Sequence, residues 1–183
     1  MLQINIFNKH LCYSIFLFLA ALAFVSCGSD NDKQLVFIGT YTGNGSEGIY
    51  SFQFDPKDGE TTQPILAARS DNPSFIAIDY AGKFLYAVNE IDNFNNDSTG
   101  AVSVFQIDHQ SGKLKLIQKI SSLGAHPAHL SLDKSGKFLL VANYTSGNIS
   151  VFPIGKDGRL GEHTAFIQNY GSSLNQERQT SPH

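Results

Sequence analysis

Residues 72–89 read NPSFIAIDYAGKFLYAVN, and residues 126–143 read HPAHLSLDKSGKFLLVAN. The two stretches, whose first residues are 54 positions apart, share a proline, an Asp-x-x-Gly-Lys-Phe-Leu core and a final asparagine. In each of them two short apolar segments flank a tight turn that contains aspartate and glycine, which is the pattern of two paired β-strands. The sequence therefore repeats a β-hairpin.

A second block follows each hairpin. It reads GAVSVFQI at 100–107 and GNISVFPI at 147–154, with an earlier copy, GIYSFQF, at 48–54. After a turn at 108–112, residues 114–120 supply a fourth strand. Four short antiparallel strands in a repeat of roughly 40 to 55 residues are typical of a β-propeller blade. We therefore predict an all-β protein built of four-stranded antiparallel blades, about three of which lie in this chain.

The start and end of the chain bear on how such blades could close into a ring. The segment VFIGTYT at 36–42 corresponds to the second strand of the next repeat, 84–89, so we expect the chain to enter its first blade at the second strand. Pro182 stands 55 positions after Pro127, where a further blade would open. We therefore expect the chain to be the N-terminal part of a longer propeller.

Composition narrows the function classes. Charged residues make up 16% of the chain, and 13 Lys and Arg against 16 Asp and Glu leave a net charge of -3. No basic face is available for a nucleic acid, so we expect no nucleic-acid partner. The abundance of glycine and phenylalanine (16 and 14 residues), with one methionine and no tryptophan, favours β-structure.

The N-terminus has the pattern of an export signal. Residues 11–25 carry no charge and are followed by Ser26 and Cys27, which resembles a bacterial lipobox. We predict a lipoprotein signal peptide at 1–26, acylation of Cys27, a flexible tether at 27–34 and a partial propeller domain at 35–183. The protein would then lie in the cell envelope, facing the periplasm or the cell surface, and touch the membrane only through its lipid anchor. A plain cleaved signal is the alternative.

Three pieces of the chain resemble one family. They are FIGTYT (37–42), HPAHLSLDKSGKFLLVANYTSGNISVFPIGKDGRL (126–160) and GSSLNQERQTSPH (171–183). They are similar to the seven-bladed propeller lactonases, which include the propeller-type 6-phosphogluconolactonases and their muconate-cyclising relatives. The resemblance implies seven blades, a lactone hydrolase of the 6-phosphogluconolactonase type acting on a sugar lactone, and a full-length protein that is monomeric.

Two residues are candidates for the chemistry. Lactone hydrolysis needs a base to activate water and a positive or hydrogen-bonding group for the charge that develops on the carbonyl oxygen. His129 is the candidate base, because it stands where Phe75 stands in the preceding repeat, on the strand expected nearest the central channel; the alternative is a histidine hydrogen-bonded within the blade interface. Arg178 is the candidate anion-binding group, with a solvated loop arginine as the alternative.

Gln179 and His183 are weaker substrate-binding candidates that the resemblance supports. The second channel histidine of the family would lie just beyond His183, so we expect this chain by itself to be inactive. We expect no cofactor, and no metal site either, because Pro127 separates His126 from His129 and no cluster of carboxylates accompanies them. A non-catalytic, envelope-anchored propeller that binds a carbohydrate or a protein partner remains the alternative function.

Overall fold

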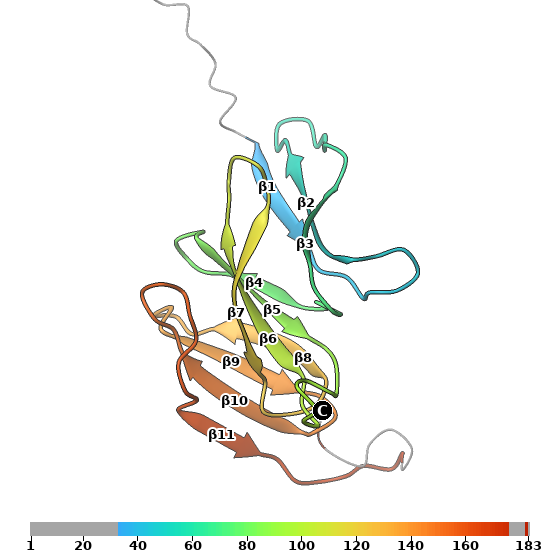
Figure 1. Ribbon diagram of the computed structural model, residues 1–183, viewed down its shortest axis with the longest axis vertical. Coiled ribbons are helices and arrows are strands. Elements are labelled where there is room, and N and C mark those ends of the chain that lie inside the picture. The colour runs from blue at the N-terminus through green and yellow to red at the C-terminus, as the bar shows by residue number, and fades with distance from the viewer. Residues whose placement is uncertain (1–32, 176–181, 183) are drawn as a thin grey trace, which may run out of the picture. The chain divides into compact units, whose positions relative to one another are not determined.

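The computed structural model describes residues 33–175 and 182, and these contain eleven β-strands in three antiparallel sheets (Figure 1). The first sheet contains β1 (Gln34–Ile38), β2 (Gly48–Phe54) and β3 (Ile65–Arg69); the second contains β4 (Ile76–Ile78), β5 (Phe84–Asn89), β6 (Ala101–Ile107) and β7 (Leu114–Ser121); the third contains β8 (Pro127–Leu132), β9 (Phe138–Asn143), β10 (Asn148–Pro153) and β11 (Ala165–Gln168). Within this part of the chain no helix occurs that could cross a membrane.

In every sheet the strands pair in chain order, so each sheet is a meander. This arrangement confirms the prediction of an all-β fold whose blades have four antiparallel strands. The first sheet has three strands because it begins at the counterpart of the second strand, as the sequence predicted. Strand β1 begins at Gln34, one residue before the predicted domain boundary.

The register of β1 differs from the sequence alignment of 36–42. Ile38 pairs with Tyr50, and Val88 pairs with Val102, where Tyr50 and Val102 each lie two residues after the glycine that opens the repeated block. Ile38 therefore takes the place of Val88, so the counterpart of 84–88 is 34–38, slightly earlier in the chain than the expected 36–42.

The middle sheet is buried on both faces. Along β5, Tyr86 and Val88 belong to the apolar cluster shared with the third sheet, while Leu85 and Ala87 belong to the cluster shared with the first. All four side chains are fully buried. Burial on both faces explains why the sequence of β5 is continuously apolar rather than alternating.

Polar contacts tie each sheet to the next in the same way. The Lys113 ammonium donates to the Leu66 carbonyl at 2.6 Å, and the Arg159 guanidinium donates to the carbonyl of Ile117. In both cases a cation after the third strand of one blade reaches the backbone of the last strand of the blade before it. The blades therefore stack through a repeated interface, as expected of repeat architectures.

The turn between the first two strands of each full blade is fixed by its aspartate. Asp133 accepts the amides of Lys137 and Phe138 at 2.8 and 2.9 Å, and Asp79 accepts the two corresponding bonds at 2.6 and 2.7 Å. A hydrogen bond from Ser135, with these amide bonds, lowers the pKa of Asp133 to about 2. The two aspartates thus hold the hairpin turns.

Candidate functional site

The candidate site lies at only one of the two ends of the blades. At the end that we call the turn end, the hairpin turns 79–83 and 133–137 are nearly identical. At the opposite end, β4 and β8 begin and β5 and β9 finish, because neighbouring strands are antiparallel. We call this the opening end and define it by residues 72–75, 89–91, 126–129 and 143–145. The candidate site lies there.

His129 lies at the opening end, on the first strand of the third blade. Leu130 pairs with Val141 as Ile76 pairs with Ala87, so His129 occupies the place of Phe75, as the sequence alignment has it. The two rings touch across the blades, with their centroids 4.2 Å apart and their planes inclined by 47°.

The imidazole of His129 is exposed, and its neighbour Leu130 is buried. It makes no hydrogen bond to any residue between 33 and 175 or to residue 182. Both ring nitrogens therefore remain available to a ligand or to water. A general base needs one ring nitrogen that is free to take a proton, and the described residues leave both free.

A cavity of about 300 Å³ opens beside His129. Most of its wall comes from the ends of β8, β9 and β10, and one lining residue, Pro182, comes from the C-terminal stretch. The other lining residues are Ala128, Ala142, Asn143, Tyr144, Gly147, Asn148, Ile149 and Asn169. Its size falls at the lower end of the range for small-molecule sites.

Two buried amides in the cavity wall leave their oxygens without a donor. Asn143 and Asn148 donate through Nδ2 to the carbonyls of Ser122 and Leu123, at 2.9 and 3.3 Å. Neither Oδ1 atom accepts a hydrogen bond from the described part of the chain. In the preceding blade the corresponding oxygen, that of Asn89, accepts one from a serine hydroxyl at 2.7 Å. Both oxygens are buried, and the third blade lacks at this end the serine–asparagine hydrogen bond that the second blade has.

Glu90 is a further candidate at the opening end that the sequence interpretation did not identify. It follows β5 directly, and its Oε2 atom accepts hydrogen bonds from the Tyr41 hydroxyl, at 2.8 Å, and from the Ser74 hydroxyl. The bond to the Glu90 carboxylate raises the pKa of Tyr41 above its usual value, so the phenol keeps its proton. The one available signal was its position, immediately after a buried strand at the opening end.

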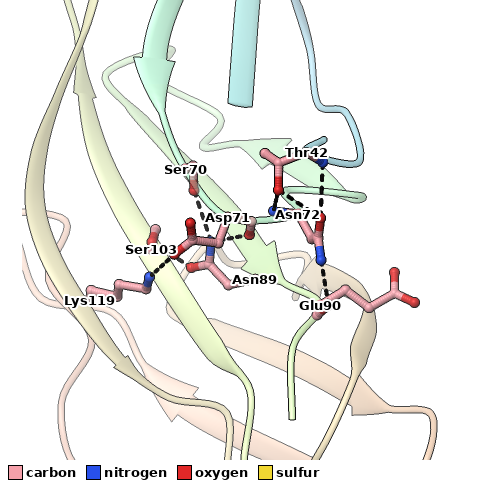
Figure 2. A network of polar contacts seen from close by, with 8 residues as sticks. All are labelled: Thr42, Ser70, Asp71, Asn72, Asn89, Glu90, Ser103 and Lys119. Atoms are coloured by element: carbon pink, nitrogen blue, oxygen red, sulfur yellow. Dashed lines mark hydrogen bonds and ion pairs between the residues drawn. The ribbon is translucent and has the colours of Figure 1, made fainter. Parts of the chain in front are cut away.

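Backbone strain and polar contacts fix the opening end (Figure 2). Asn72 and His126, the residues before the two repeated prolines, both have positive φ, at 39° and 51°. The Asn72 amide oxygen accepts from both the amide and the hydroxyl of Thr42, each at 2.9 Å. His126 is held by the Thr145 hydroxyl, 2.9 Å from its Nδ1 atom. These contacts position the backbone from which β4 and β8 start.

His126 and His129 do not form part of a metal centre in the described residues. No group of three His, Cys, Asp or Glu side chains in that part of the chain could hold a metal ion. The ring of His126 faces Thr145, whereas the ring of His129 lies on Phe75.

The remaining predicted site residues, Arg178, Gln179 and His183, lie outside the described residues, and so does Cys27 with the predicted signal peptide. Pro182, between Gln179 and His183 in the chain, lines the cavity next to His129.

Comparison with known proteins agrees with this geometry. The model of the family described as "Lactonase, 7-bladed beta-propeller" matches residues 35–183. A 6-phosphogluconolactonase of Bacillus subtilis is 37% identical over 151 residues, which cover 82% of this chain and 42% of that protein. One of Formosa agariphila is 34% identical over 81% of this chain and 41% of its own length.

Solved structures give the same picture. A crystal structure from Bacteroides fragilis is 39% identical, with a TM-score of 0.75, over 85% of this chain and 42% of the other. The periplasmic gluconolactonase of Pseudomonas aeruginosa is 33% identical, with a TM-score of 0.70, over 81% and 42%. The chain thus spans less than half the length of these relatives. The family match and the three meander sheets together show that the chain belongs to the seven-bladed β-propeller lactonase family.

Proposed function

We propose that the full-length gene product, meaning this chain with any residues that its gene encodes beyond it, hydrolyses a sugar lactone. The observation that carries the proposal is His129, an exposed imidazole that makes no hydrogen bond to the described residues and lies beside a small cavity at the opening end. The family match and the names of the relatives from Bacillus subtilis and Pseudomonas aeruginosa support a lactone as the substrate class.

In this proposal His129 activates water. The imidazole takes a proton from a water molecule as its oxygen adds to the lactone carbonyl carbon. The carbonyl oxygen becomes negatively charged, and the Arg178 guanidinium stabilises that charge or binds the acidic end of the substrate. The ring C–O bond then breaks, and the leaving alkoxide receives the proton from the imidazolium. The product is the open-chain sugar acid, with Gln179 and His183 in contact with its polar groups.

We propose that activity requires blades beyond the three that this chain contains. Three sheets form less than half of a seven-bladed ring, so we propose that residues 27–183 alone have no lactonase activity. The interface that each blade offers to the next is apolar, and in these residues Leu140 and Ile167, on the face of the third sheet opposite to Val141, are 36% and 49% exposed. Such an uncovered surface favours self-association.

We also propose that the protein is a lipoprotein of the cell envelope, acylated at Cys27. In that location an unphosphorylated sugar lactone is the favoured substrate, because a phosphorylated metabolite is a cytosolic compound. Mass spectrometry of the membrane fraction tests this directly. A mature chain that retains residues before Cys27, or that carries an unmodified cysteine, would contradict it.

A panel of lactones separates catalysis from binding. The full-length gene product, its Arg178→Ala variant and residues 27–183 are assayed with phosphorylated and unphosphorylated gluconolactone. We expect turnover by the first, a loss of about 100- to 1,000-fold in the second with an unchanged melting temperature, and none in the third. If the full-length protein hydrolyses no lactone, the non-catalytic, envelope-anchored propeller becomes the better interpretation.

A further inference from the structure

The Glu90 carboxylate has an unused hydrogen-bond acceptor at the opening end. Its Oε2 atom already accepts from Tyr41 and Ser74, while its Oε1 atom has no partner in the described part of the chain. A carboxylate can accept about four hydrogen bonds, so at least two acceptor positions remain. In Figure 2 its side chain points away from Ser70, Asp71 and Lys119.

Two successive residues contact Glu90 and His129: Ser74 contacts Glu90, and Phe75 contacts His129. The Ser74 hydroxyl donates to Glu90, and the next residue, Phe75, carries the ring on which the His129 imidazole rests, with centroids 4.2 Å apart. Glu90 and His129 therefore lie at the same end of two adjacent blades.

The charge of Glu90 selects what can bind there. Among residues 33–175 the ion pairs of this region join Lys119 to Asp71 and Arg69 to Glu47, and none includes Glu90. A negative charge that no cation among residues 33–175 offsets repels the phosphate or carboxylate of a substrate. It attracts hydroxyl groups, which donate hydrogen bonds, and bonds to an ionised acceptor are about twice as strong as neutral ones.

We propose that Glu90, positioned by Tyr41 and Ser74, is a hydroxyl-binding residue that makes the site specific for polyhydroxylated lactones. It fixes the hydroxyl-bearing part of the ring and directs any acidic end of the substrate away from the first two blades. This inference deepens the proposed lactonase function and rests on it. The competing role is purely structural, because the Tyr41 bond joins the first blade to the second.

The test compares two lactones with the same six-membered ring. Glucono-1,5-lactone carries ring hydroxyls, and δ-valerolactone carries none. In the full-length gene product we expect Glu90→Gln to lower kcat/KM for glucono-1,5-lactone at least about tenfold, and to change that for δ-valerolactone less than about twofold. The matched control is Glu162→Gln, which removes the same charge from an exposed position on the third blade. It should leave both values unchanged.

Two further variants address the structural role. Tyr41→Phe and Ser74→Ala each remove one hydrogen bond that holds the carboxylate, and each should reduce the preference for glucono-1,5-lactone by less than Glu90→Gln does. An equal loss with both lactones, accompanied by a lower melting temperature, would assign Glu90 to blade packing and overturn the proposal. No loss with either lactone would overturn it as well.

A binding measurement keeps this inference separate from the proposed function. The ring polyol 1,5-anhydroglucitol has the hydroxyls of the sugar but no carbonyl, so it cannot be hydrolysed. Its binding to the wild-type protein, followed by NMR titration, should be lost in Glu90→Gln and retained in Glu162→Gln. If the wild type hydrolyses no lactone but shows this pattern, the lactonase function fails and the hydroxyl site stands. If it does not bind the polyol, the hydroxyl site fails.

Discussion

Successive blades keep the same side chains at the turn end and differ at the opening end. At the turn end, Asp79 and Asp133 make the same pair of bonds to backbone amides in successive blades. At the opening end, Phe75 in one blade is replaced by His129 in the next, and Glu90 is replaced by Tyr144. Repetition preserves what every blade needs in order to fold. Chemistry is possible where the repeats have diverged.

The largest effect should distinguish two adjacent residues of β8. Leu130 is buried in the core between the second and third sheets, and His129 beside it is exposed. We expect Leu130→Ala to lower the free energy of unfolding by about 2–5 kcal/mol and His129→Ala by less than about 0.5 kcal/mol. Urea unfolding of the two variants measures this. A comparable loss in both would give His129 a structural role.

Tyr86 tests the contact between blades near the turn end. Its buried hydroxyl donates to the Gly158 carbonyl of the next blade at 3.0 Å. We expect Tyr86→Phe to cost about 1 kcal/mol of unfolding free energy, because the carbonyl loses its donor, and to leave turnover unchanged. Reduced turnover with unchanged stability would contradict the view that residues near the turn end serve the fold and residues at the opening end serve catalysis.

Tyr86 should also make stability depend on alkaline pH. Burial raises the pKa of its phenol from 10.0 to about 12 in the folded state. The stabilisation of the protonated form is therefore present below pH 10 and disappears as the pH rises toward 12. The difference in melting temperature between the wild type and Tyr86→Phe should shrink over that interval.

The smallest effect is expected at the exposed aspartate of the turn. Hydrogen bonds hold the pKa of Asp133 near 2, below its usual 3.8, so its contribution to stability is present above pH 3.8 and disappears as the pH falls toward 2. Asp133→Asn should lower the melting temperature at pH 7 by a few degrees and leave turnover unchanged. The matched control is Asp92→Asn, at an exposed position, which should change neither. A difference that persists at pH 2 would show that the carboxylate charge is not the cause.

The sequence predicted the repeated parts of the fold well, because each repeat supplied a second copy for comparison. The hairpin strands β5 and β9 and the block strands β6 and β10 agree with the predicted segments. Strand β11 was not predicted, since its four residues match no other repeat and pairing with β10 defines it. The strand of the first blade was expected at 36–42 and lies at Gln34–Ile38, because it lacks the Asp-Gly turn that fixes the position of the others.

The candidate site was only partly predictable. His129 was identified because a polar residue replaced an apolar one in an alignment of repeats. Glu90 could not be identified in that way, because its counterpart is a tyrosine and its partner Tyr41 lies 49 residues earlier. Contacts between blades join residues that are distant in the sequence, so they cannot be predicted from a local sequence pattern.

The most direct test of the account is to give the third blade the opening-end residue of the second. In the full-length gene product, His129→Phe places a Phe75-like ring where the candidate base stands. We predict a loss of about 100-fold or more in turnover of glucono-1,5-lactone, with the melting temperature unchanged. Wild-type turnover by this variant would show that the divergence at the opening end does not carry the chemistry.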